Sequence, residues 1–197
     1  MYPSSSGAVC YDGAIRFACY MMIDFDAKLV KVGSWTVVVL PPSASTQLPS
    51  RGQAMVQGTF NGVDLQTPLE PDGTGTHWFR PDGKLLKATS AKLGDTVSIS
   101  IEPVKAWPEP EVPADWQKAL AADKQARALW ERVTPMARWE WIRWARATSN
   151  AETRQRRIEV GCSKLRNGER RPCCWNRNLC TEPTVSKNGV LLKPSSV

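Results

Sequence analysis

The residues best suited to chemistry are arginines and tryptophans gathered in the C-terminal half of the chain. The segment 137–146 holds three tryptophans within six residues, interleaved with arginines. An arginine guanidinium forms paired hydrogen bonds with carboxylate and phosphate groups and stacks on aromatic rings. This pattern predicts an anion-binding surface with an aromatic platform. The candidate platform residues are Trp139, Trp141, Trp144 and Trp175.

The positive charge of the chain is concentrated in the same region. The formal net charge is +7, and residues 134–177 contain eleven Arg or Lys against four Glu, so this segment carries the whole excess. Concentrated charge makes a binding face, whereas dispersed charge mainly affects solubility. We therefore expect a non-enzymatic binding protein with an anionic partner: nucleic acid, an acidic protein or an anionic surface. The arginines expected to contact it are Arg138, Arg143, Arg146, Arg154, Arg156, Arg157, Arg170 and Arg171.

A structural interpretation of these side chains stays open beside the functional one. On a helix, Trp141 and Trp144 share one face while Trp139 and Arg143 lie on another, so two tryptophans can anchor a core and a third can pack under an arginine. The arginines would then pair with glutamates and backbone carbonyls, and the protein would be a scaffold. A structure in which most of these guanidinium groups are buried would favour this alternative.

A second set of candidates surrounds the single histidine. Glu70, Asp72 and His77 lie in one turn-rich segment. General acid–base catalysis needs a histidine with a positioned partner in a pocket, which spacing within a loop does not establish. The sequence favours a structural histidine. An enzyme of unknown reaction, with its pocket at the edge of a barrel and Glu70, Asp72 and His77 as catalytic residues, is the alternative.

The cysteines suggest a third kind of chemistry. Cys173 and Cys174 follow Arg170 and Arg171, whose charges would lower a thiol pKa, so both are candidate reactive thiols. The six cysteines lack the two-residue spacing of zinc ligands, and we expect neither a metal nor another cofactor. Unevenly spaced cysteines, with neither a signal peptide nor a long apolar run, predict a cytoplasmic protein with reduced thiols.

The elements that must position these residues divide the chain in two. Short β-rich runs separated by turns, among them Asn61-Gly62, predict a small β-barrel of about six strands over 26–105. The runs are 29–32, 35–40, 54–60, 63–69, 76–80 and 96–104. Three prolines within 107–113 predict a stiff connector over 106–114.

The second half is expected to be a basic bundle of about four helices over 115–180. The helices run to about residues 122, 132, 147 and 166, and Gly168 lies just past the last. Their candidate capping residues are Asp115, Asp123, Thr134, and Ser149 or Asn150. The expected fold class is α+β. Residues 1–25 form an expected N-terminal extension and 181–197 a C-terminal tail, neither with an assigned role.

Blocks of both halves resemble known bacterial families. The blocks SWTVVVLP at 34–41, LPSRG at 48–52, NG at 61–62, LEPDG at 69–73, HW at 77–78 and GDTV at 94–97 resemble a small β-barrel domain of unknown function. The blocks WPEPEVP at 107–113, TPMARW at 134–139, WIRW at 141–144, ETR at 152–154 and RRPCC at 170–174 resemble the bacteriocin-protection family named YdeI or OmpD-associated (OmdA).

This resemblance spans about residues 26–194. It implies a barrel followed by helices, a link to resistance against antimicrobial peptides or envelope stress, and no assigned catalytic residues. Because such peptides are often cationic, a basic domain is not expected to neutralise them directly. The sequence does not fix the oligomeric state.

Overall fold

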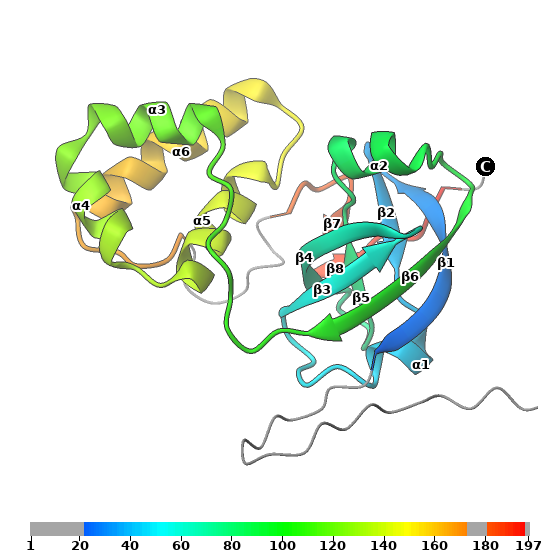
Figure 1. The fold of residues 1–197 in the computed structure, drawn as a ribbon. Helices are drawn as coiled ribbons and strands as arrows, with labels where there is room; N and C mark the ends of the chain where they lie inside the picture. Colours follow the sequence, from blue (N-terminus) through cyan, green and yellow to red (C-terminus); the bar gives the residue numbers. More distant parts are fainter. Residues whose placement is uncertain (1–21, 173–180, 196–197) are drawn as a thin grey trace, which may run out of the picture.

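The computed structural model describes residues 22–172 and 181–195 of the chain. Strands form a closed barrel in the N-terminal half, and helices pack beside it in the C-terminal half (Figure 1). The predicted fold class, α+β with a small barrel followed by about four helices, is confirmed. Over the described residues, no helix combines the length and apolar composition needed to span a membrane.

The barrel consists of six antiparallel strands in the spatial order β1-β2-β5-β4-β3-β6. Alternate side chains point inward, so residues such as Val56, Phe60 and Ile99 are buried in its core. The strands are β1 (Ile23–Val32), β2 (Trp35–Val39), β3 (Ala54–Phe60), β4 (Val63–Pro71), β5 (His77–Phe79) and β6 (Thr96–Pro103).

The hairpin predicted at Asn61-Gly62 is confirmed. Both residues have positive φ, 48° and 77°, as a tight primed turn requires, and Phe60 pairs with Val63 across it. The turn therefore fixes the register of β3 against β4, which decides which backbone groups of β4 face away from β3.

The first strand begins earlier than predicted. β1 starts at Ile23 rather than at residue 29, and its first half pairs with β6. Ile23 is buried while Asp24 and Asp26 are exposed, which is the alternation of a half-buried strand. The aspartates obscured this pattern because they interrupt an otherwise apolar run.

Two short helices were not expected from the sequence. They are α1 (Pro42–Ser45) and α2 (Gly83–Thr89), and α2 begins where a turn was predicted at Pro81-Asp82-Gly83. The Asp82 side chain accepts a hydrogen bond from the Leu85 backbone N–H at 2.8 Å, so the turn residue is an N-cap. Leu85 is buried in the barrel core, and this tertiary packing stabilises a helix of only seven residues.

Four longer helices make the bundle: α3 (Ala114–Ala122), α4 (Lys124–Arg132), α5 (Pro135–Arg146) and α6 (Ala151–Arg166). Asp123, Thr134 and Asn150 cap α4, α5 and α6 as predicted, each accepting a backbone N–H. The cap predicted at Asp115 is wrong, because α3 has Pro113 at its N-cap and Asp115 lies in its first turn. There the Asp115 carboxylate pairs with Arg154 of α6 instead.

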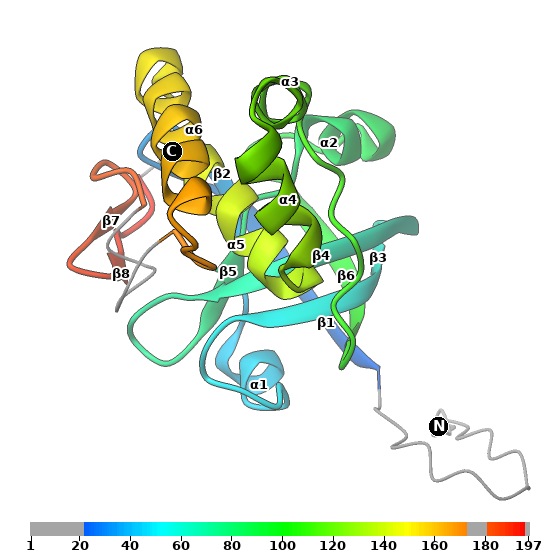
Figure 2. The ribbon, with the colours of Figure 1, turned by 90° about the vertical axis from the view of Figure 1, so that its left-hand side faces the viewer.

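Aromatic rings fill the core of the bundle. The Trp116 ring lies 5.7 Å from Trp130 and 6.2 Å from Trp141, centroid to centroid. Trp116 and Trp141 are the two largest fully buried side chains in the described part of the chain. Of the four helices, α5 lies nearest the barrel (Figure 1), and Figure 2 shows the bundle in front of it.

The C-terminal tail ties the two halves together. Its two short strands, β7 (Ser186–Lys187) and β8 (Val190–Leu191), form a small sheet, and Val185 is buried against Val32 and Trp35 of the barrel. The Glu182 carboxylate accepts hydrogen bonds from Ser149, which lies between α5 and α6, and from Ser34, which lies between β1 and β2. The tail thus contacts both the barrel and the helices.

Candidate functional site

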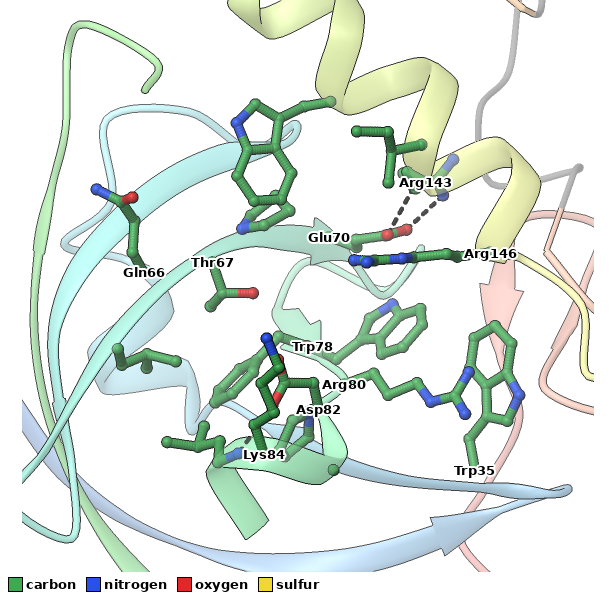
Figure 3. Close-up of a pocket in the computed structure, with 18 of the residues that line it drawn as sticks. Trp35, Gln66, Thr67, Glu70, Trp78, Arg80, Asp82, Lys84, Arg143 and Arg146 are labelled. Atoms are coloured by element: carbon green, nitrogen blue, oxygen red, sulfur yellow. Dashed lines mark hydrogen bonds and ion pairs between the residues drawn. The ribbon is translucent and has the colours of Figure 1, made fainter. Parts of the chain in front are cut away.

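A pocket of about 710 Å³ lies between the barrel and the helical bundle (Figure 3). Residues 63–68 of β4 form one wall, the segment from Trp78 into α2 forms another, and the C-terminal half of α5 closes the third. The volume falls within the usual range for small-molecule sites. Its apolar lining includes Trp35, Trp78, Phe79, Trp139 and Ile142.

Two arginines of this pocket have no charged partner among the described residues. Arg80 follows β5, and its guanidinium lies 4.5 Å from the centroid of the Trp35 ring. Arg146 is the last residue of α5 and reaches into the pocket below the Glu70–Arg143 pair (Figure 3). Over residues 22–172 and 181–195, neither guanidinium forms a hydrogen bond or ion pair with the protein. Both side chains are open to the solvent of the pocket.

The surroundings of these two groups oppose their positive charge. Burial lowers the pKa of Arg80, and the charge of Arg146 lowers it further. Burial likewise lowers the pKa of Arg146, and Arg154 adds to the effect. Glu182 acts in the opposite direction on Arg80, and Asp82 on Arg146, but only through space. An anion bound beside either guanidinium would offset its positive charge.

The lining as a whole is basic. Of its charged residues, five are basic and three are acidic. One acid and one base neutralise each other, because Arg143 Nε donates to Glu70 Oε1 at 2.6 Å and the Arg143 Nη2 atom donates to Glu70 Oε2. These side chains are only 10% and 14% exposed. This two-pronged ion pair joins α5 to β4 and holds one wall of the pocket in place.

Most of the other predicted anion-binding arginines are engaged within the protein. Arg138 pairs with Glu109 at 2.5 Å and also donates to two backbone carbonyls. Arg154 makes a two-pronged pair with Asp115, and Arg157 donates to the Trp144 carbonyl.

The rest of the predicted set lies away from the pocket. Arg156 and Arg170 are exposed, and Arg171 Nε lies 3.8 Å from a Glu140 carboxylate oxygen. Arg146 is thus the member of the predicted set that lines the pocket without a described partner. The structure does not bring the eight arginines together as one continuous face.

The tryptophans of 137–146 take three different positions. Trp141 is buried in the bundle core, and Trp144 lies 5.7 Å beneath the Arg157 guanidinium. Trp139 lines the pocket, and its indole N–H donates to the Pro108 carbonyl at 2.8 Å. Trp175, together with Cys173 and Cys174, lies outside the described residues.

The three residues proposed for acid–base chemistry do not meet. His77 is fully buried, with Nδ1 2.7 Å from Ser45 Oγ and Nε2 2.8 Å from the Gly52 carbonyl oxygen, so neither nitrogen bonds to a carboxylate. The Asp72 carboxylate accepts from the backbone N–H groups of residues 74–76. Glu70 is held by Arg143.

Sequence reasoning missed the barrel side of the pocket. Arg80, Trp35 and Trp78 were not among the predicted site residues, although the sequence offers one signal for Arg80. It directly follows the short, fully buried strand His77–Phe79 and precedes Pro81, so a charge is placed at the end of a core strand.

Comparison with protein families assigns both halves of the chain. Residues 109–168 match the family described as bacteriocin-protection, YdeI or OmpD-associated (OmdA), and residues 25–101 match a domain of unknown function, DUF1905. Arg80 lies in the DUF1905 match and Arg146 in the OmdA match, so the pocket is lined by both matched regions. A comparison with curated proteins finds no match.

The resemblance noted in the sequence is therefore confirmed, and the OmdA match links the chain to bacteriocin protection. The family descriptions name no ligand and no reaction. The helical half of the chain thus matches the OmdA family, and the barrel that precedes it matches DUF1905.

Proposed function

We propose that this chain is a non-enzymatic binding protein that receives an anionic group between Arg80 and Arg146. The observation that carries the proposal is the presence of two guanidiniums without a described carboxylate partner in one interdomain pocket. Both residues are exposed, so their guanidiniums can bind an anion from solution. A carboxylate or phosphate accepts several guanidinium hydrogen bonds at once and supplies the missing opposite charge.

The shape of the site favours a small acidic molecule or a single protein segment over nucleic acid. A duplex is bound by rows of basic side chains on an open surface. Here Arg138, Arg143, Arg154 and Arg157 are occupied by internal partners. Protection against bacteriocins would then depend on an acidic ligand or partner rather than on direct capture of a cationic peptide.

Thermal unfolding in different anions tests the proposal. We expect sodium phosphate and sodium acetate to stabilise the full chain more than sodium chloride at the same ionic strength. A ligand at ten times its Kd contributes about 1.4 kcal/mol. Arg80→Gln and Arg146→Gln should lose this anion-specific stabilisation, because each removes one of the two guanidiniums.

The matched control is Arg156→Gln, which removes an exposed arginine of α6 outside the pocket and should respond like the wild type. Without added anion, Arg146→Gln should be at least as stable as the wild type, since Arg146 has no described carboxylate partner to lose and its charge lowers the pKa of Arg80. Absence of any anion-specific effect, or an equal effect in Arg146→Gln and the wild type, would refute the proposal.

A further inference from the structure

Among the described residues, strand β4 has no strand partner along much of one edge. β3 pairs with β4 from Val63 to Leu69, whereas β5 pairs only with Glu70 and Pro71. Because Val63 is hydrogen-bonded to Phe60 beside the hairpin turn, the odd-numbered residues bond to β3 and the even-numbered ones direct their N–H and C=O groups away from it. Asp72 is also even-numbered and follows β4, and its N–H accordingly points away from β3 and donates to the Thr76 carbonyl at 2.9 Å.

The unpaired backbone groups belong to Asp64, Gln66 and Pro68. Within the described residues, the N–H groups of Asp64 and Gln66 have no hydrogen-bond acceptor. Both residues are exposed. An unpaired strand edge of this kind is a template for pairing with another extended chain.

This edge forms a wall of the pocket. Six consecutive residues, 63–68, border the cavity. Successive side chains of a strand point to opposite faces, so an unbroken run of lining residues means that the pocket lies against the edge of the strand. Figure 3 shows Gln66 and Thr67 on the strand that passes along the cavity.

The two arginines lie where an added strand would have to stop. A chain paired with Gln66 and Pro68 would lie on the same side of β4 as β5. It could not extend past Pro68, because β5 already pairs with β4 at Glu70. Arg80 directly follows β5, and Arg146 faces the same end from α5. The strand would therefore end next to two guanidiniums, and the end of a peptide that carries negative charge is its C-terminal carboxylate.

The other walls suit the side chains of such a peptide. Alternate residues of an added strand would face α5, at Trp139 and Ile142, and the barrel opening, at Leu65 and Leu85. From Asp64 to Pro68 the edge covers roughly 13 Å at about 3.3 Å per residue, which is enough for a short peptide.

We propose that this pocket binds the C-terminal segment of an extended peptide, which pairs with the free edge of β4 and places its carboxylate between Arg80 and Arg146. The inference rests on the proposed anion site and adds the chemical class of the ligand. Backbone pairing supplies affinity in this mode of recognition, and the pockets for alternate side chains supply specificity. Apolar residues at the C-terminus of the peptide are preferred.

A peptide mixture tests this directly. The full chain is incubated with N-acetylated pentapeptides of randomised sequence, either with a free C-terminal carboxylate or amidated, and bound peptides are identified by mass spectrometry after gel filtration. We expect the free acids to be enriched at least tenfold over the amides. The enrichment should disappear in Arg146→Gln and persist in Arg156→Gln.

A second measurement isolates the strand pairing. Methylation of one backbone nitrogen of an enriched peptide, scanned along its length, should weaken binding at least tenfold at alternate positions, because it removes a hydrogen bond to β4. Gln66→Pro should weaken peptide binding similarly while leaving phosphate stabilisation unchanged, since proline is tolerated where a strand N–H faces outward.

The outcomes separate the two proposals. Phosphate stabilisation without enrichment of free-acid peptides, or enriched peptides that are insensitive to methylation at every position, would overturn the peptide inference and leave the anion site standing. If the wild type shows neither phosphate stabilisation nor enrichment of free-acid peptides, the anion site and the peptide inference are both overturned.

Discussion

Arginines one helical turn apart take different roles because their neighbours differ. Arg143 meets the Glu70 carboxylate and becomes a structural link, while Arg146 extends into the same pocket and meets no carboxylate among the described residues. Proteins place uncompensated charge mainly where a ligand supplies the counterpart, at a cost in stability. At the residue scale, Arg146 is therefore a candidate binding residue because it both lines the pocket and lacks a described carboxylate partner, whereas Arg143 is structural.

Asp72 gives a pH-dependent prediction at the same scale. Burial raises its pKa, but hydrogen bonds from Thr74 and Thr76 outweigh burial and lower the pKa from 3.8 to about 2. A lowered pKa stabilises the fold fully above the unfolded-state value, and this contribution is lost as the pH falls toward 2. We expect Asp72→Asn to reduce the free energy of unfolding by about 2 kcal/mol at pH 7.

Urea unfolding of both proteins across this pH range measures the effect. The difference between wild type and Asp72→Asn should shrink steadily from pH 5 to pH 2. Asp24→Asn, at an exposed position of β1, is the control and should change stability by less than about 0.5 kcal/mol. A difference for Asp72→Asn that is the same at pH 7 and pH 2 would show that its carboxylate charge is unimportant.

At the scale of elements, the packing of α6 against α3 depends on a glycine. A Cβ atom built on Gly161 would lie 2.5 Å from the outer edge of the buried Trp116 ring. Alanine is normally favoured over glycine in a helix by about 1 kcal/mol. Because Trp116 is enclosed by Trp130 and Trp141, it has little room to move.

We therefore expect Gly161→Ala to destabilise the protein in spite of its better helix propensity. Overpacking costs about 1–3 kcal/mol, which exceeds the gain in propensity over most of that range. Chemical unfolding measures the net change, with Val160→Ala on the exposed face of the same helix as a control that should be neutral or slightly stabilising. Stabilisation by Gly161→Ala would show that Trp116 can shift freely.

The contact between β4 and α5 gives a second prediction for elements. Arg143→Met leaves the largely buried Glu70 carboxylate without its partner, which should cost about 3 kcal/mol. Adding Glu70→Gln removes the unpaired carboxylate charge and should recover most of the lost free energy of unfolding. Urea unfolding of both single variants and the double variant gives the coupling free energy, and strictly additive effects would mean that the pair does not join the two elements energetically.

At the scale of the whole molecule, the tail acts as a clasp over the junction of barrel and helices. Glu182 accepts the Ser149 N–H at 2.8 Å and the Ser34 hydroxyl at 3.4 Å, which belong to different halves of the fold. Burial raises the pKa of Glu182, but the hydrogen bonds from Ser149, Thr184 and Ser34 outweigh it and keep the pKa low, so the carboxylate is charged. The clasp holds residues that flank the pocket.

Removing this carboxylate should loosen the tail without unfolding the barrel. In Glu182→Ala we expect the Leu191 and Leu192 amides, which are bonded to Asp72 and Val185, to exchange hydrogen about tenfold faster, as loss of roughly 1.4 kcal/mol predicts. Amides of β3 and β6 should be unaffected. Thr184→Val, which removes a single hydrogen bond to Glu182, should have a smaller effect. Equal exchange in wild type and Glu182→Ala would exclude the clasp.

Local chemistry made much of the fold predictable. The Asn61-Gly62 turn, the caps at Asp123, Thr134 and Asn150 and the bounds of α4 follow from residues close together in the chain. Capping and tight turns depend on side chains and φ angles within about four residues, so the sequence displays them directly. The short helix α2 was missed because its stability comes from burying Leu85 in a distant core.

The sequence by itself determined the two-part architecture and the location of the excess charge. Only the tertiary structure decided which arginines remain available to bind a ligand. Arg143 pairs with Glu70, 73 residues away in the sequence, and Arg154 pairs with Asp115, 39 residues away. Likewise, the free edge of β4 exists because β5 ends at Phe79, a limit set by pairing between strands. Pairing over such separations depends on how whole elements pack, and residue spacing does not encode it.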